Sequence, residues 1–168
     1  GIDIESIGSD TWGVDVVMMG KDGGVLRNPY SYRDPHTEGA MEDYFQHISK
    51  EEVYEKTGIQ FMPFNTLFQL SAMHSHHDSA LEDASKILFI PDALIYMLTG
   101  EAVCEHTILS TSQFLNPRTG RIDPELIGVM GLDEQHFGRY VMPGEQVDRL
   151  TAEVQQMTGV GALPVVAV

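Results

Sequence analysis

The stretch Ser9–Leu26, SDTWGVDVVMMGKDGGVL, decides how the rest of the chain is interpreted. Its apolar run predicts a strand over Val14–Met19. Asp22-Gly23 is a strong reverse-turn signal because glycine accepts a positive φ without steric cost. We therefore expect a turn at Lys21–Gly24 and a return strand through Val25 and Leu26. Ahead of this hairpin, Ile4 and Ile7 indicate another short strand.

The segment between the two strands carries the candidate site residues Thr11, Trp12, Gly13 and Asp15. Glycine lets a ligand approach the backbone, tryptophan offers an apolar plane, and carboxylates accept hydrogen bonds from hydroxyl groups. This combination predicts binding of a small polyhydroxy ligand. The same residues also fit a buried tryptophan at a strand crossing with two solvated aspartates, and spacing alone favours this second interpretation.

Composition indicates a globular protein and narrows its partners. Of the 168 residues, 42% are apolar and 21% are charged, and the net charge of −15 disfavours nucleic acid and anionic membranes as partners. The single cysteine, Cys104, excludes an internal disulfide and fits a reducing, cytoplasmic location. No apolar run approaches the roughly 20 residues of a membrane span, and no signal peptide is visible.

An α/β architecture follows from the two ends of the chain. Pro164–Val168 is an apolar, β-branched run that needs cover on both faces, so we expect it to pair in parallel with Ile4–Ser9. The helices then form a large insertion between these strands. Predicted helix caps are Thr37, Ser49, Asn65, Asp92, Asp123, Asp133 and Thr151. The start without methionine and the apolar end predict a fragment of a longer protein.

Three loops have alternative interpretations. Arg33, in Tyr32-Arg33-Asp34, either bridges carboxylates near a ligand or is an ordinary surface arginine. The loop Pro63-Phe64-Asn65, with Phe61 before it, either faces a ligand or fills the core. The hydroxyl groups of Ser110–Ser112 either bind an anion or serve turns and caps, and turn chemistry is favoured.

The histidine-rich stretch His74–Asp78, HSHHD, suggests a metal site, but its spacing matches no closed zinc pattern. The polar end of a surface helix explains it better, so we predict that His74, His76 and His77 hold no metal. The chain also lacks a G-x-x-x-x-G-K-[ST] loop, a G-x-G-x-x-G loop and a G-x-S-x-G elbow.

Five segments together resemble the carbohydrate kinases, a family that includes glycerol, xylulose and ribulose kinases, and within it the rhamnulokinase branch. They are SIGSDTWGVDVVMM (Ser6–Met19), YRD (Tyr32–Asp34), TGIQFMPFNTLFQL (Thr57–Leu70), IPDALIYMLTG (Ile90–Gly100) and HTILSTSQFLN (His106–Asn116). They occur in order and span essentially the whole chain. TWGVD and TGIQFMPFNTLFQL are specific to the branch, whereas LTG after the PDAL segment is shared more widely in the family.

The resemblance implies part of a ribonuclease-H-like (actin-like ATPase) domain with a helical insertion, its early strands missing. Residues 1–168 would be a single incomplete domain, the N-terminal sugar-binding part of a two-domain kinase. The parent would use ATP and Mg²⁺ to convert L-rhamnulose to L-rhamnulose 1-phosphate in rhamnose catabolism. The family's ketose contact falls on Gly13, with Thr11, Trp12 and Asp15 added by position.

The same resemblance places the general-base aspartate just after Val168, so no residue of this chain inherits that role. We expect this chain alone to bind no cofactor, to lack kinase activity and to self-associate through an exposed sheet edge. Two alternatives stay open: a non-catalytic sugar-binding or regulatory module derived from a kinase, and a metal-binding structural protein based on the HSHHD stretch.

Overall fold

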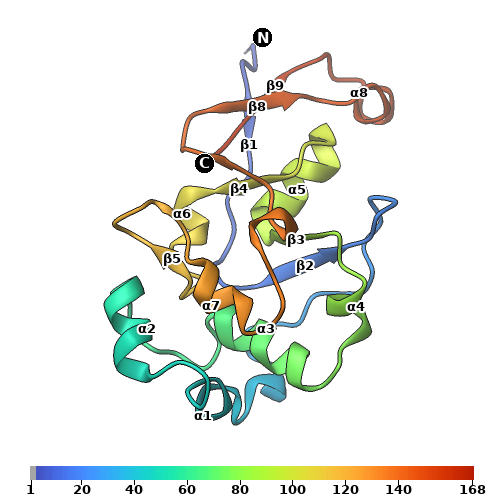
Figure 1. The fold of residues 1–168 in the computed structure, drawn as a ribbon. Helices are drawn as coiled ribbons and strands as arrows, with labels where there is room; N and C mark the ends of the chain where they lie inside the picture. Colours follow the sequence, from blue (N-terminus) through green and yellow to red (C-terminus); the bar gives the residue numbers. More distant parts are fainter. Residues whose placement is uncertain (1–2) are drawn as a thin grey trace.

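The computed structural model describes residues 3–168, and residues 3–8 and 164–168 lie at the same end of the molecule (Figure 1). There a three-stranded sheet has the order β1 (Ile7–Gly8), β9 (Pro164–Val166) and β8 (Gln146–Arg149). β1 runs parallel to β9, with Ile7 opposite Val165, while β8 is antiparallel to β9. The predicted parallel pairing of the two end segments is therefore confirmed, with all other elements inserted between β1 and β9.

Three two-stranded sheets form the middle of the molecule. β2 (Val16–Met19) is antiparallel to β3 (Lys86–Phe89), and β4 (Val103–Glu105) is parallel to β7 (Arg139–Val141). β5 (Leu115–Asn116) and β6 (Arg121–Ile122) form a short antiparallel pair. β2 is buried along its whole length, which explains its uninterrupted apolar sequence.

The predicted hairpin after β2 is correct only at its turn. Gly23 adopts a φ of +78°, and the Gly20 amide donates to the Gly24 carbonyl oxygen at 2.8 Å. The return is limited to a bridge between Met19 and Val25 and a bond from the Leu26 amide to the Met18 carbonyl oxygen. β2 instead pairs with β3, because this distant apolar strand can bury its own side chains against β2, whereas Val25 and Leu26 stay exposed.

The helices follow in chain order and are mostly short. They are the 3₁₀ turn Pro35–Thr37, α1 (Ala40–Tyr44), α2 (Lys50–Thr57), α3 (Thr66–Ser75), α4 (Ser79–Glu82), α5 (Ile90–Thr99), α6 (His106–Leu109), α7 (Pro124–Gly128), the 3₁₀ turn Glu134–His136 and α8 (Ala152–Thr158). Figure 1 shows α1, α2 and α3 gathered at the end opposite the three-stranded sheet.

Four of the predicted caps are confirmed, and three are corrected. Thr37 is wrong as a cap, because it ends the 3₁₀ turn Pro35–Thr37 and α1 begins after Gly39. Asp133 is confirmed, since it accepts a hydrogen bond from the Gln135 amide. Ser49, Asp123 and Thr151 each accept a hydrogen bond from an amide in the first helical turn. The Asn65 side chain instead donates to Gln60 and Gln113, so only its backbone precedes α3. Asp92 lies inside the first turn of α5, and its carboxylate accepts from the Glu105 amide.

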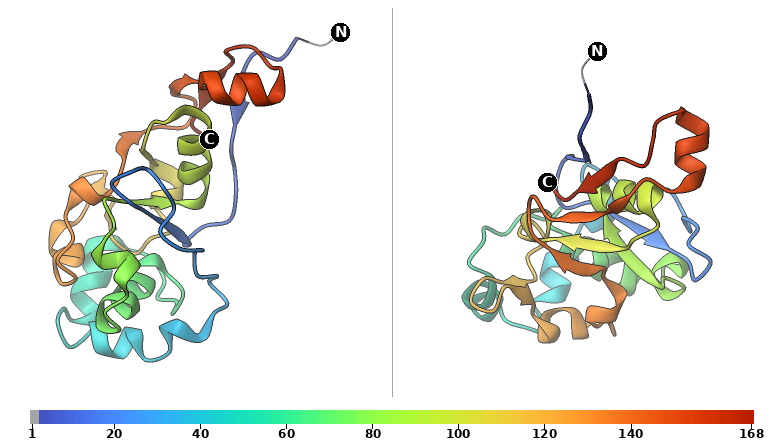
Figure 2. Two further views of the ribbon diagram at one scale, coloured as in Figure 1. Left: turned by 90° about the vertical axis from the view of Figure 1, so that its right-hand side faces the viewer. Right: turned by 90° about the horizontal axis from the view of Figure 1, so that it is seen from above.

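The main hydrophobic core surrounds α3 and extends to β3, β5, β6 and α7. Every residue from Thr66 to Met73 is buried, so α3 is packed on all sides. A second cluster joins α5 to the terminal sheet, and a third joins β2 to β3 and α5. Figure 2 shows α5 between the terminal sheet and the β2–β3 pair, which makes it the link between the two ends of the molecule.

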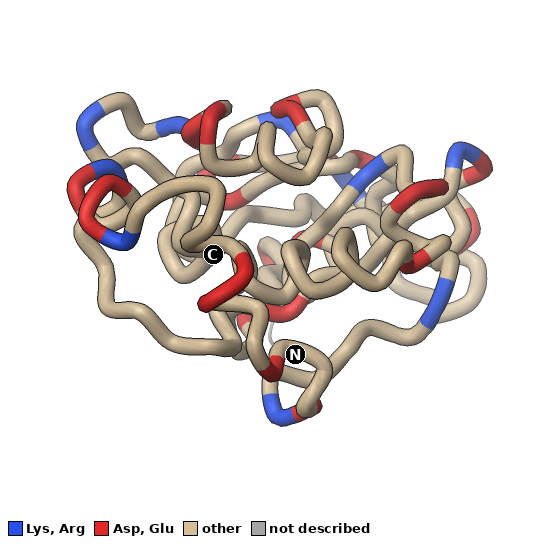
Figure 3. Tube along the Cα trace, turned by 60° about the horizontal axis from the view of Figure 1, so that its bottom comes forward, with Lys and Arg blue, Asp and Glu red and all other residues tan. Residues whose placement is uncertain are grey.

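Acidic residues occur along the whole trace, whereas the ten basic residues are scattered among them (Figure 3). The net charge of −15 follows from 25 acidic against ten basic residues. Within residues 3–168, the structure has no helix that is both long and apolar enough to cross a membrane.

Candidate functional site

The predicted site segment Thr11–Asp15 leads directly into β2 and lies beside a small pocket. The pocket has a volume of about 210 Å³ and is lined by Trp12, Gly13, Val14, Tyr32, Phe64 and Thr111. Its lining comes from four separate parts of the chain, and it is smaller than the roughly 300–1,000 Å³ of a drug-sized pocket. A cavity of this size suits a small ligand.

Aromatic side chains form the walls of the pocket. The Trp12 side chain is 54% exposed, so its indole is available to a ligand. Tyr32 and Phe64 meet edge to face, with ring centroids 5.7 Å apart. Arg33 lies 5.3 Å from the Tyr32 ring centroid, and its Nε donates to the Tyr32 hydroxyl at 2.9 Å. The pocket therefore combines apolar ring faces with a polar rim.

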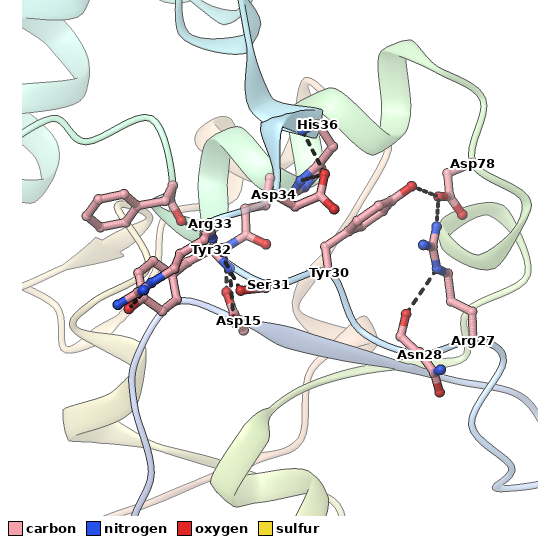
Figure 4. A network of polar contacts seen from close by, with 12 residues as sticks. Asp15, Arg27, Asn28, Tyr30, Ser31, Tyr32, Arg33, Asp34, His36 and Asp78 are labelled. Carbon is pink, nitrogen blue, oxygen red and sulfur yellow. Dashed lines mark hydrogen bonds and ion pairs between the residues drawn. The ribbon is translucent and has the colours of Figure 1, made fainter.

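Asp15 lies behind the pocket and holds its walls. Its carboxylate is 2% exposed and accepts hydrogen bonds from Trp12 Nε1 at 2.7 Å, the Tyr32 amide at 3.2 Å and Gln69 Nε2 at 3.0 Å. Figure 4 shows Asp15 beside the segment that carries Tyr32. Because these donors occupy the buried carboxylate, Asp15 fixes Trp12 and Tyr32 and does not line the pocket.

The other predicted site residues have distinct positions. Gly13 lines the pocket and lies so close to Thr111 that a Cβ built on it would be 2.9 Å from both Thr111 Cγ2 and Oγ1. Thr11 is half-buried and donates to the Trp12 carbonyl oxygen, outside the pocket lining. The alternative interpretation of this segment is wrong for both decisive residues, because Trp12 is exposed and Asp15 is buried.

Several residues of the site were either left with two interpretations by the sequence or not assigned to the site at all. For the Phe64 loop, the sequence left open whether it faces a ligand or fills the core. In the structure Phe64 lines the pocket, while Phe61 packs against the core. Thr111 belongs to the hydroxyl-rich stretch and serves turn chemistry, since its hydroxyl donates to the Ile108 carbonyl oxygen. Tyr32 and Gln69 lie in segments that carry the family resemblance, but no local pattern assigned either side chain to the site, which they reach only through the tertiary fold.

A stacked group of side chains supports the segment that carries Tyr32 (Figure 4). The His36 and Tyr30 rings stack with centroids 4.0 Å apart, and the Arg27 guanidinium lies over Tyr30 at 3.8 Å while binding Asp78 at 2.6 Å. The His36 side chain is 8% exposed, and neither ring nitrogen has a hydrogen-bond partner among residues 3–168. Burial lowers the pKa of His36, against the opposing effect of Asp34.

Two buried groups near β4 are also perturbed. Burial raises the pKa of Asp92 to about 8, although the bond from the Glu105 amide opposes this shift. Burial also raises the pKa of the Cys104 thiol well above its usual value. Neither residue lines the pocket, so these shifts belong to the interior of the fold.

The described residues do not provide a metal site. Between residues 3 and 168, no group of three or more histidine, cysteine, aspartate or glutamate side chains is arranged to hold a metal ion. His74, His76 and His77 are all exposed near the end of α3, as a polar helix end requires.

Comparison with known proteins places the chain in a family. Residues 2–168 match the N-terminal domain of the FGGY family of carbohydrate kinases. The chain is 61% identical over all 168 residues to a rhamnulokinase from Bacteroides thetaiotaomicron, and 43% identical over 152 residues to one from Pectobacterium atrosepticum. It covers 35% and 31% of these relatives, so it spans about a third of their length.

Solved structures share the same fold. A ligand-bound xylulose kinase from Lactobacillus acidophilus superposes with a TM-score of 0.90 at 19% identity, over 99% of this chain and 34% of that one. A Plasmodium falciparum glycerol kinase with ADP gives 0.86 at 15% identity, over 99% and 34%. The α/β fold is thus that of the ribonuclease-H-like, actin-like sugar kinases, as expected. The chain belongs to the FGGY family of carbohydrate kinases.

Proposed function

We propose that residues 1–168 are the sugar-binding part of the N-terminal domain of an ATP-dependent ketose kinase, and that its substrate is L-rhamnulose. The product is L-rhamnulose 1-phosphate, in rhamnose catabolism in the cytoplasm. The observation that carries the proposal is a small aromatic pocket on the TWGVD segment of a chain 61% identical to a rhamnulokinase.

Within the pocket, Trp12, Tyr32 and Phe64 cover the C–H faces of the sugar, as aromatic rings commonly do for small ligands. Gly13 presents its backbone to the sugar, and Thr111 closes the floor. Of the predicted substrate-binding residues, Gly13 and Trp12 contact the ligand. Asp15 and Thr11 do not contact the ligand. Asp15 accepts a hydrogen bond from the Trp12 indole, and Thr11 donates one to the Trp12 carbonyl oxygen.

Phosphoryl transfer depends on in-line positioning of the nucleophile and on neutralising charge. The contribution of these residues is positioning: they hold the ketose and exclude water from one side of it. ATP and Mg²⁺ supply the phosphoryl group and its charge neutralisation, and we assign their binding to parts of the full-length protein outside these residues. From the family resemblance we likewise propose that the general-base aspartate of the full-length protein lies just after Val168.

Isothermal titration of this chain with L-rhamnulose, D-xylulose, D-ribulose and glycerol tests the proposal, with L-rhamnulose expected to bind most tightly. Trp12→Ala should abolish binding, while Tyr54→Ala, which removes an exposed aromatic ring outside the pocket, should not. The chain alone should release no ADP from ATP and Mg²⁺ with L-rhamnulose. Absence of sugar binding, or equal loss in both variants, would contradict the proposal.

The alternative function is a non-catalytic sugar-binding module. An activity assay of the full-length protein distinguishes it from a kinase. If that protein binds L-rhamnulose but releases no ADP in a coupled assay with ATP and Mg²⁺, the binding-module interpretation replaces the kinase. The 61% identity to a rhamnulokinase favours the kinase.

Self-association is a further part of the proposal. β1 is the edge of its three-stranded sheet, and an unpaired edge strand invites pairing with a second copy. We expect light scattering to detect a concentration-dependent increase in mass for this chain. A monomer at all concentrations would refute the edge argument alone and leave the sugar-binding proposal in place.

A further inference from the structure

The backbone at the base of the pocket is strained at Val14. Its φ is +68°, and the Asp15 amide donates to the Gly13 carbonyl oxygen at 2.9 Å, which closes a γ-turn centred on Val14. A β-branched residue at positive φ is a conformational outlier, and such outliers persist only where the surroundings impose them. Of the non-glycine residues with positive φ in the described chain, Val14 is the one that lines the pocket.

Side chains from remote segments hold both polar groups of Val14. Its amide donates to Thr111 Oγ1 at 3.1 Å, and its carbonyl oxygen accepts from Thr66 Oγ1 at 2.8 Å and Gln69 Nε2 at 3.3 Å. Thr66 and Gln69 are buried within α3. Because the Thr111 hydroxyl donates to Ile108, its lone pair is left to face the Val14 amide. The strained turn is therefore clamped on both sides.

Gln69 connects this clamp to the pocket walls. Its Nε2 group donates to Asp15 Oδ1 at 3.0 Å and to the Phe64 carbonyl oxygen at 2.8 Å, in addition to Val14. Asp15 in turn fixes the Trp12 indole at 2.7 Å. One buried amide thus reaches the γ-turn, the carboxylate behind Trp12 and the backbone of Phe64 without lining the pocket.

We propose that Gln69 is a positioning residue, which together with Thr66 and Thr111 holds the γ-turn at Val14 and so fixes Trp12 against the ligand. The ligand's identity as a ketose rests on the function proposed above, whereas the positioning of Trp12 does not. The turn gives Trp12 and Asp15 opposite environments, one exposed and one buried, although they are three positions apart.

Trp12 is the only tryptophan of the chain, so its fluorescence reports on the clamp directly. Gln69→Met keeps the side-chain length but removes the donor, and Thr66→Val removes one bond. Thr99→Val is the matched control, because Thr99 is a buried threonine that donates to Ile95 within α5, outside the pocket lining. The assay measures steady-state anisotropy and acrylamide quenching of Trp12 without ligand, then titration with L-rhamnulose.

We expect Gln69→Met to lower the anisotropy of Trp12, to increase its quenching and to weaken sugar binding about tenfold, with Thr66→Val in the same direction. Thr99→Val should leave all three quantities unchanged. Unchanged Trp12 anisotropy and sugar affinity in both Gln69→Met and Thr66→Val, or equal changes in Thr99→Val, would overturn the inference. If Gln69→Met fails to fold, as judged by circular dichroism, Thr66→Val decides alone.

The two proposals fail in different ways. If the unaltered chain does not bind L-rhamnulose, the proposed function fails, yet the ligand-free anisotropy still tests whether Gln69 positions Trp12. If the unaltered chain binds the sugar and the variants do so equally well with unchanged anisotropy, only the positioning role fails.

Discussion

Replacing Gly13 by alanine should reveal a direct steric link between the TWGVD segment and Thr111. The added Cβ would lie 2.9 Å from Thr111 Cγ2 and Oγ1 and 3.1 Å from Thr111 Cβ. Real Cβ atoms do not approach other atoms to 2.9 Å, so Thr111 must move. Its hydroxyl bridges the Val14 amide and the Ile108 carbonyl oxygen, and moving it disturbs both bonds.

The magnitude follows from these contacts. Overpacking costs about 1–3 kcal/mol, and a disturbed hydrogen bond adds about 1 kcal/mol, so Gly13→Ala should lower the free energy of unfolding by about 2–4 kcal/mol. Thr111→Ala alone should cost about 1–2 kcal/mol. In the double variant Gly13→Ala/Thr111→Ala, only the 3.1 Å contact between the two Cβ atoms remains. The double variant should therefore be about 1–2 kcal/mol more stable than the sum of the two single changes predicts.

Urea unfolding of the three variants and the unaltered chain, followed by circular dichroism, measures this cycle. Free-energy changes that add within about 0.5 kcal/mol would refute the steric argument. In the full-length protein, Gly13→Ala should raise the KM for the ketose more than that for ATP, because the pocket floor shifts. Equal effects on both substrates would argue against Gly13 as part of the sugar site.

Three further predictions concern titratable groups. The pKa of Asp92 is raised to about 8 in the fold, so between about pH 4 and pH 8 the folded chain holds a proton that the unfolded chain has lost. The free energy of unfolding should therefore fall by about 1.4 kcal/mol per pH unit over this range. Urea unfolding of Asp92→Asn should not show this fall. The pKa of His36 is lowered in the fold, so stability should fall below about pH 6.5. His36→Phe, which keeps the stack on Tyr30, should reduce that fall in urea unfolding. His74, His76 and His77 should bind no stoichiometric metal, and elemental analysis finding a transition metal that triple alanine substitution removes would contradict this.

Local signals predicted the parts of the fold that depend on neighbouring residues. Ser49 and Thr151 accept bonds from amides three positions on, and Gly23 supplies the positive φ of its turn. Each is a short-range match between one side chain and the adjacent backbone. The β1–β9 pairing was predictable for another reason: an apolar β-branched strand needs cover, and few other segments offer it.

Strand pairs and hydrogen bonds between residues far apart in the sequence were not predictable from local signals. β2 pairs with β3, although a plausible return strand lies much nearer in the chain. Similarly, Asp92 has the sequence context of a cap, but tertiary packing turns its carboxylate toward the Glu105 amide. In both cases the decisive quantity is burial in three dimensions, which no local pattern encodes.

The site shows the same division. The residue types in TWGVD predicted a binding segment, but which of them lines the pocket depends on the γ-turn at Val14. That turn depends on Thr66, Gln69 and Thr111, which are 52, 55 and 97 positions away from Val14. A threonine or glutamine inside an apolar segment has no distinctive signature, so these residues were visible only once the chain was folded.

The burial of α3 explains why the strained turn can be held there. Thr66 and Gln69 lie on α3, whose residues Leu67, Phe68 and Leu70 are fully buried. The two donor side chains therefore cannot move without opening the main core. A clamp on a rigid element positions its target more precisely than one on a loop. The helical insertion is therefore part of the site: it supplies Phe64 directly, and through Gln69 it sets the orientation of Trp12.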